Sequence, residues 1–363
     1  MARPKSQSVS AATVTVDPLA SSGWPDWADP LASRRLRNII GERRIGHAYL
    51  LSGPRGVGKA QLAIAFAQAL CCTNVDADDR SQPCGACRAC RNVQRGAHPD
   101  VERFDIAAQN ALAENPTPRA TLSIDTVRRL RSSAALLPLE ASRRILIVDD
   151  AESLLEPAQQ ALLKTLEEPP PAVTLLLLAD EPETLLETVR SRCQEVSVRP
   201  VAEPLVIAAL SDRGVEPDLA HEIARLSRGC PGWALTAAGD RATLQGRRQE
   251  WSDATAWVGA APYERLVTAY RLGEQFSKRR SDVLGVVQAA VQLLRDRMIA
   301  AAGRQSTDAA AGAPAPDARA AFQLGVAVAA SLKCLGDLEA NVRPRLALEA
   351  MVLQWPNLDH QQT

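Results

Sequence analysis

A glycine-rich loop followed by a lysine is the first stretch of this sequence that could do chemistry. It reads "GPRGVGK", with Gly53, Gly56, Gly58 and Lys59, and it lies between an apolar run and a helical pattern, which is the context that a phosphate-binding loop (P-loop) requires. Its backbone N–H groups and the start of the helix would face phosphate oxygens, and the lysine would reach the terminal phosphates. The alternative is a glycine-rich turn without a ligand. The next residue is Ala60, whose methyl group cannot ligate magnesium as Ser or Thr would, so catalysis should be more impaired than binding.

Two acids follow the apolar run "RRILIV" and could form the second half of a nucleotide site. They are Asp149 and Asp150, roughly ninety residues after the glycine-rich loop. In such sites one acid holds the magnesium, and the next, usually Glu in hydrolysing proteins, orients the attacking water. A strand that ends in two acids at a sheet edge is also common without any ligand. The upstream P-loop favours a nucleotide-type site.

Three cysteines in "CGACRAC" have the spacing of metal ligands. They are Cys84, Cys87 and Cys90, and a fourth ligand could come from Cys71 or Cys72 at the end of the helix that follows the P-loop. Four thiolates suit tetrahedral zinc, and such a site leaves no open position for catalysis. The alternative is free thiols. We therefore predict a structural zinc site.

An arginine in a short loop, Arg192, could have a chemical role that depends on what surrounds it. Arg192 lies in "RSRC", shortly after a strand, and "LLKTLEEPPP" before it reads as a helix stopped by its prolines. Taken alone, this arginine is expected to be a solvated loop residue. A chemical role would depend on an assembly.

Short apolar runs that alternate with helical patterns must position these groups. The runs are "HAYLLSG", "DVERFDI", "RRILIVDD" and "VTLLLLAD", and helical patterns such as "GKAQLAIAFAQALC" and "EPAQQALLKTLEE" separate them. This alternation predicts a parallel sheet wrapped by helices. The strands are almost wholly apolar, as expected when both faces of the sheet are covered. The fold class is therefore α/β with a P-loop core.

The chain divides into four predicted segments. Residues 1–25 are rich in Ser, Ala and Pro and read as a flexible tail. Residues 26–200 form the α/β core with the cysteine module. Residues 201–245 read as short helices of a lid-sized module, and residues 246–363 as long amphipathic helices of an all-α domain.

Composition limits the class of function. The chain has 363 residues, 46% of them hydrophobic, and Lys plus Arg equals Asp plus Glu at 42 each. No global charge draws it onto nucleic acid, which argues against an autonomous DNA-binding protein. No apolar run is expected to approach the roughly 18 residues that span a bilayer, and the N-terminus lacks the apolar segment of a signal peptide. We therefore expect a cytoplasmic protein without a membrane partner.

The sequence resembles a known protein family over several of these stretches. The stretches "GHAYLLSGPRGVGK", "CGACRACRNVQRGAHPDV", "RRILIVDDAESL", "ALLKTLEEPP" and "TLLETVRSRC" are similar to the delta-prime family of bacterial clamp-loader subunits. These subunits belong to the DNA polymerase III holoenzyme and to the AAA+ proteins. The resemblance covers the first two hundred residues. It implies an AAA+ core, a helical lid and a C-terminal collar domain used for oligomerisation.

The departures from the motor subunits of that family imply a loss of hydrolysis. Where the motors carry a P-loop Thr, a Walker B Glu, a polar sensor residue and a lid arginine, this chain has Ala60, Asp150, "LADEP" and "CPGWAL". ATP binding is expected to be weak or absent. The resemblance implies that Arg192 acts in trans as an arginine finger on ATP held by a neighbour. It also gives a preference for Cys71 as the fourth zinc ligand, since the family places a cysteine directly after an apolar pair, in this chain "AL".

The resemblance also implies partners. These are the tau/gamma and delta subunits, the sliding clamp, and primed DNA reached through the complex. One rival interpretation is an ATP-hydrolysing motor of the tau/gamma type, which the four altered elements oppose. Another is a zinc-bearing nucleic-acid-binding module, which neutral net charge and only 4% aromatic residues oppose.

Overall fold

The computed structural model describes residues 23–74, 79, 81–112, 120–303, 317–339 and 342–356. Its contacts divide the chain into two compact units, Met1–Asp240 and Arg241–Thr363. Most of the predicted flexible tail, residues 1–22, lies outside the described residues. The last part of that predicted tail is described, and Gly23 and Pro25 are buried.

The first unit is built on one parallel sheet. Its strands are β1 (Ala48–Ser52), β2 (Val101–Phe104), β3 (Arg144–Val148), β4 (Val173–Ala179) and β5 (Gln194–Ser197), in the order β2-β3-β4-β1-β5. Because all five strands run the same way, their carboxyl ends meet at one edge. The glycine-rich loop after β1 and the acids after β3 therefore share that edge. The predicted α/β fold class, with a parallel sheet and the glycine-rich loop between β1 and α2, is confirmed.

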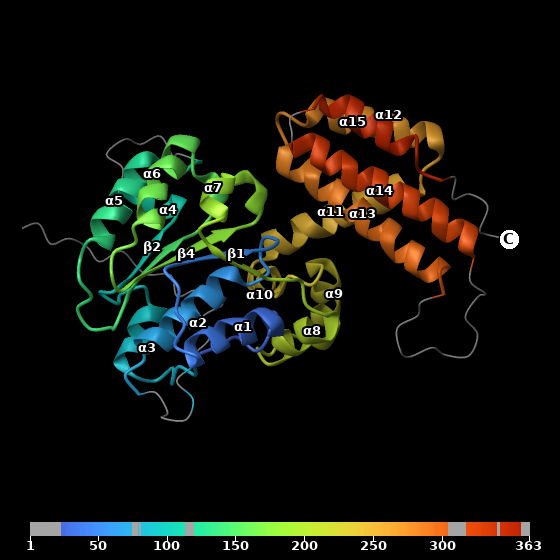
Figure 1. Ribbon diagram of the computed structural model, residues 1–363. Coiled ribbons are helices and arrows are strands. Elements are labelled where there is room, and N and C mark those ends of the chain that lie inside the picture. The colour runs from blue at the N-terminus through green and yellow to red at the C-terminus, as the bar shows by residue number, and fades with distance from the viewer. Residues whose placement is uncertain are drawn as a thin grey trace, which may run out of the picture. The chain divides into compact units, whose positions relative to one another are not determined.

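Helices cover both faces of this sheet (Figure 1). One face carries α1 (Pro30–Gly41), α2 (Lys59–Cys71) and α3 (Arg88–Gln94), and the other carries α4 (Ile106–Ala111), α5 (Ile124–Ala134) and α6 (Glu156–Glu167). Strand residues alternate between the two faces. Leu50 packs into the core cluster that includes Leu162 of α6, while the ring of Tyr49 meets Phe66 of α2 edge-on at 5.4 Å. Both faces of the sheet are therefore packed against helices, as its apolar strands require.

The lid follows the sheet within the same unit. The short helix α7 (Glu187–Arg190) precedes β5, and the lid consists of α8 (Glu203–Ser211), α9 (Pro217–Ser227) and α10 (Pro231–Gly239). Each lid helix has a proline in its first turn, where the missing N–H costs no helical hydrogen bond. The predicted short helices are therefore present in this segment.

The residues that the structure describes in the second unit form helices and no strand, as predicted. It comprises α11 (Arg241–Gly259), α12 (Pro262–Gln275), α13 (Arg280–Ala301), α14 (Ala318–Glu339) and α15 (Pro344–Val352). Its core gathers around Trp257, Leu294 and Leu348. The buried Arg265 donates to the carbonyl oxygens of Val258 and Pro356 at 2.8 and 2.7 Å. The guanidinium thereby joins two chain segments inside this core.

Helix α14 departs from an expectation drawn from composition. Ala318–Leu338 is long and apolar enough to cross a membrane by those two criteria, with 33% of the window buried. The same helix contributes Leu324 and Cys334 to the core of the second unit. One such helix in a packed domain is weak support for a membrane span.

Candidate functional site

The phosphate-binding loop lies between β1 and α2, as the sequence predicts. Lys59 is the first residue of α2 and is only 7% exposed. Gly56 and Gly58 have φ angles of 78° and 107°, which side-chain-bearing residues rarely adopt. The glycines at these positions are therefore required by the backbone of the loop.

Lys59 is engaged by groups of the protein itself. Its Nζ lies 2.5 Å from Oδ1 of Asp180 and donates to the carbonyl oxygens of Gly53 and Pro54 at 2.5 and 3.2 Å. The charge that would meet a terminal phosphate is thus balanced by a carboxylate. Asp180 belongs to "LADEP", the stretch at the position of the motors' sensor residue, but its pairing with Lys59 was not predicted. Its position directly after β4, the strand beside β1, was the available signal.

The lid closes on the same loop. The backbone N–H of Trp233, in α10, donates to the carbonyl oxygen of Gly56 at 3.1 Å. A Cβ atom on Gly232 would lie 2.7 Å from that oxygen, so only glycine fits at this approach. On another side of the loop, the indole of Trp27 packs against Gly58. Neither tryptophan was singled out from the sequence.

The two acids after β3 have different surroundings. Asp149 pairs with Arg103, whose Nη2 lies 2.6 Å from its Oδ2. Asp150 has a left-handed backbone, with φ 53° and ψ 48°, and burial together with the neighbouring Asp149 raises its pKa. Arg103 of β2 was not predicted as part of this site. The first of the two acids is therefore already neutralised by a cation of the chain.

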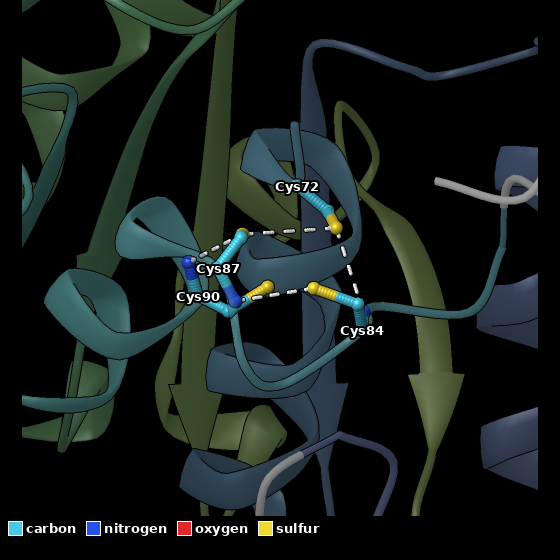
Figure 2. Close-up of side chains that lie close together, drawn as sticks. All are labelled: Cys72, Cys84, Cys87 and Cys90. Carbon is cyan, nitrogen blue, oxygen red and sulfur yellow. Dashed lines mark hydrogen bonds between the residues drawn. The ribbon is translucent and has the colours of Figure 1, made fainter. Parts of the chain in front are cut away.

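Four cysteine side chains between the end of α2 and the first turn of α3 point toward one another (Figure 2). The sulfur atoms of Cys72, Cys84, Cys87 and Cys90 all lie within 4.8 Å of one another. Backbone N–H groups donate to three of them in succession: Cys84 to Sγ of Cys72 at 3.4 Å, Cys87 to Sγ of Cys84 at 3.2 Å, and Cys90 to Sγ of Cys87 at 3.4 Å. Such bonds stabilise thiolates, which are the form that binds a metal.

The structure corrects the preference for Cys71 as the fourth member. Cys71 is the last residue of α2, and its side chain is buried at 5% exposure, where burial raises the pKa of its thiol to about 12. Cys72 caps the helix with an extended backbone, φ −60° and ψ 126°. That turn directs the Cys72 side chain toward the other three cysteines. The preference for Cys71 was based on the preceding apolar pair, which gives no information about the backbone direction at Cys72.

The chemistry of the four cysteines fits a metal ion. Burial acts to raise the pKa of Cys87, but hydrogen bonds from the backbone of Cys90 and Thr73 outweigh it and lower this pKa to about 5. Four sulfur donors within reach of one centre form the closed, tetrahedral type of site. The cluster could therefore hold a metal.

Arg192 follows α7 and connects two of the predicted motifs. Its Nη2 lies 2.9 Å from Oε1 of Glu167, the last residue of α6, and its Nη1 donates to the carbonyl oxygen of Thr188 at 2.9 Å. The side chain remains 36% exposed. The arginine is thus held by one exposed ion pair and by one hydrogen bond to a backbone carbonyl of the preceding turn. The sequence pattern around Glu167 does not indicate this pairing with Arg192.

Sequence comparisons identify similar proteins for part of this chain. Residues 28–202 match the family described as "DNA polymerase III, delta subunit". The chain is 30% identical over 197 residues to DNA polymerase III subunit delta' of Bacillus subtilis, which covers 54% of this chain and 54% of that protein. It is 31% identical over 179 residues to subunit tau of the same bacterium, covering 49% of this chain and 29% of that protein. The match thus spans about half of one relative and less of the other.

Solved structures share low sequence identity with the chain. A DNA polymerase III gamma subunit-related protein of Thermotoga maritima has a TM-score of 0.38 at 18% identity, covering 89% of this chain and 97% of that one. The Holliday junction branch migration motor RuvB of Thermotoga maritima has a TM-score of 0.39 at 15% identity, covering 61% of this chain and 64% of that one.

Proposed function

We propose that the chain is a delta-prime-type subunit of the bacterial DNA polymerase III clamp loader. The match of residues 28–202 to the family described as "DNA polymerase III, delta subunit" and the similarity to delta' and tau of Bacillus subtilis support this proposal. The subunit works in the cytoplasm with tau/gamma and delta subunits. Together they place the sliding clamp on primed DNA during replication. The C-terminal helical unit, near residues 246–363, serves as the collar through which the subunits assemble.

The ion pair between Lys59 and Asp180 is the main support for the proposal that this subunit does not hydrolyse ATP. Phosphoryl transfer depends on a cation at the terminal phosphates and on magnesium held by a hydroxyl and an acid. In this chain the lysine is paired with Asp180, the hydroxyl position is Ala60, and Asp149 is paired with Arg103. A nucleotide would have to break both ion pairs and open the lid contact at Gly56. Gly53, Gly56, Gly58, Lys59, Asp149 and Asp150 are then an altered nucleotide site with weak or no ATP binding.

Arg192 is the chemical contribution of this subunit to its neighbour. Its only ion pair among the described residues is with Glu167, whose side chain is 51% exposed, and such exposed pairs are worth little. The guanidinium can therefore leave Glu167 for a phosphate of ATP bound to an adjacent motor subunit. There it would stabilise the charge that develops on the transferred phosphoryl group.

A structural zinc ion completes the proposal. Cys72, Cys84, Cys87 and Cys90 would hold it, and it would cross-link the end of α2 to the loop before α3 and to the first turn of α3. With four protein ligands it would have no position for substrate. Its contribution would be to the stability of this module alone.

Nucleotide binding and turnover by the isolated chain test the non-hydrolysing role. We expect negligible phosphate release and little binding of a fluorescent ATP analogue. Ala60→Thr should not change this, because Lys59 remains paired and the lid remains on Gly56. The tau subunit of Bacillus subtilis, assayed in parallel, is the positive control.

A motor function is the second candidate, because tau of Bacillus subtilis is as similar to this chain as delta' is. Steady ATP turnover by the unmutated chain would establish the motor function instead. Turnover only after Ala60→Thr would mean that the missing hydroxyl, rather than the paired lysine and the lid, blocks the reaction.

A further inference from the structure

A short segment before α1 links the cysteine cluster to the phosphate-binding loop. We name residues 23–29, "GWPDWAD", the N-terminal strap. Five of its seven residues are buried, although it forms neither helix nor strand. A segment without regular structure is buried only when its side chains make specific contacts. Those contacts lie at three separate places.

The first end of the strap holds the loop that carries Cys84. The indole Nε1 of Trp24 donates to the carbonyl oxygen of Ser81 at 2.7 Å, and a Cβ on Gly23 would lie 3.8 Å from the carbonyl oxygen of Pro83. Ser81 is itself fixed by Asp79, whose Oδ1 accepts from its N–H at 3.0 Å and from its hydroxyl at 2.5 Å. The strap therefore grips the backbone directly before Cys84.

The middle of the strap rests on the phosphate-binding loop. Trp27 is 2% exposed, and a Cβ on Gly58 would lie 2.8 Å from its Cζ3 atom. The indole thus occupies the space that a side chain at position 58 would need. Among the described residues, no acceptor lies within hydrogen-bond reach of the buried Trp27 Nε1. An unsatisfied buried donor costs free energy, so this contact depends on the rest of the strap to hold it.

The last residue of the strap fixes it to α1 and to the end of the sheet. Asp29 accepts through Oδ1 from the N–H of Leu31 at 2.9 Å, which caps α1. Through Oδ2 it accepts from the N–H of Arg199 at 2.9 Å, just after β5. The strap is therefore attached at Asp29 as well as at Trp24.

We infer that the N-terminal strap couples the metal state of the cysteine cluster to the phosphate-binding loop. With metal bound, the loop from Ser81 to Cys84 is fixed, Trp24 is held, and Trp27 stays on Gly58. Without metal, the loop releases Trp24, and the cover over Gly58 loosens. This inference rests on the proposed metal site. It adds that binding of the metal changes how firmly Trp27 packs against the phosphate-binding loop.

Hydrogen exchange on the full chain, with zinc and after chelation by EDTA, tests the coupling. We expect residues 23–29 and the amides of Gly53 and Val57, which donate to Ala179 and Pro54, to exchange faster without metal. Losing the net stabilisation of one hydrogen bond predicts that the exchange rate of these amides rises about fivefold. The strands β3 and β4 should not change. Equal acceleration in every strand would be general unfolding and would contradict a directed path.

Two matched tryptophan variants complete the experiment. Trp24→Phe removes the bond to Ser81 and should accelerate exchange at Gly53 and Val57 even with zinc bound. Trp355→Phe removes a comparable bond, from Nε1 to the hydroxyl of Ser331 at 3.0 Å, and should leave these amides unchanged. Zinc that binds but changes nothing at Gly53 and Val57 overturns the coupling alone. A chain that binds no zinc overturns both the coupling and the metal site.

Discussion

Asp100 is a buried carboxylate that sequence reasoning did not single out, and it fixes the loop that leads into β3. It is 0% exposed and accepts from the backbone N–H groups of Leu139, Glu140 and Ala141 at 2.7, 2.7 and 2.8 Å. Burial acts to raise its pKa, but these three bonds outweigh burial and lower it below its ordinary value. The ionised form is therefore favoured in the folded chain.

Replacing this carboxylate should cost stability in a pH-dependent way. Asp100→Asn turns an amide NH2 group toward backbone donors and should lower the free energy of unfolding by about 3 kcal/mol at pH 7. Because the folded pKa is lowered, the wild-type advantage is complete above the unfolded pKa of about 3.9. It is lost as the pH falls through the folded value. Urea unfolding followed by circular dichroism at pH 7, 5 and 3 measures the difference.

Asp125 provides the control for this prediction. It forms an exposed pair with Arg128, at 2.8 Å and with both side chains more than half exposed. Asp125→Asn should change the free energy of unfolding by less than about 1 kcal/mol at any of these pH values. A difference between wild type and Asp100→Asn that does not shrink at pH 3 would show that Asp100 does not act through its charge.

The adjacent cysteines Cys71 and Cys72 offer a matched test of the metal site. Protein purified without chelator should contain about one zinc ion per chain. Cys72→Ser should lower this content sharply, whereas Cys71→Ser should leave it unchanged because that side chain lies outside the cluster. Elemental analysis by mass spectrometry measures both. Loss of zinc from Cys71→Ser alone would restore the ligand set expected from the sequence.

Residue identity was easier to predict from the sequence than residue pairing. The glycine-rich loop, the acids after β3 and three of the four clustered cysteines follow from type and spacing. The partners of Lys59, Asp149 and Arg192 do not, because each ion pair joins elements that are distant in the chain. The choice between Cys71 and Cys72 depended on one backbone turn at the end of α2.

At the scale of elements, the approach of α10 to the phosphate-binding loop depends on one glycine. Gly232→Ala would place a Cβ 2.7 Å from the carbonyl oxygen of Gly56 and should push the lid away from the loop. We expect the free energy of unfolding to fall by about 1–3 kcal/mol. We also expect faster exchange of the Trp233 amide, which donates to that oxygen. Thermal unfolding and hydrogen exchange provide the two measurements.

Gly239 is the matched control, at the other end of α10. A Cβ there would meet nothing within 4 Å, so Gly239→Ala should be neutral or slightly stabilising through helix propensity. If Gly232→Ala is as stable as Gly239→Ala and its Trp233 amide remains protected, then the lid is not held on the loop in solution.

The elements themselves were largely predictable, since hydrophobic pattern and turn residues are local. The four apolar runs became β1 to β4, and the helical patterns became α2 and α6. The strand order and the closure of α10 over Gly56 result from packing between distant segments. The apolar length of α14 was underestimated because its polar residues are spaced among small apolar ones.

At the scale of the whole molecule, the two compact units would have different tasks in the proposed complex. The unit Met1–Asp240 carries the glycine-rich loop, the cysteine cluster and Arg192, while the described residues of Arg241–Thr363 form helices around their own core. With equal numbers of acidic and basic residues, the chain is expected to reach DNA through its partners. The proposed action of Arg192 on ATP would then be measurable only in a complex.

The measurement that tests this account most directly is clamp loading and DNA-stimulated ATP hydrolysis by complexes reconstituted with Arg192→Ala. The variant should fold and assemble normally, because an exposed arginine contributes little to stability. The site facing this subunit should lose roughly a thousandfold in rate. Total ATPase should fall only in part, because the other ATP sites of the complex keep their own arginines, and clamp loading should fall further than total ATPase. Arg44→Ala, at an exposed pair with Glu42, is the control and should behave as wild type. If Arg192→Ala complexes assemble and load clamps as fast as the control, Arg192 does not act in trans and the central claim is wrong.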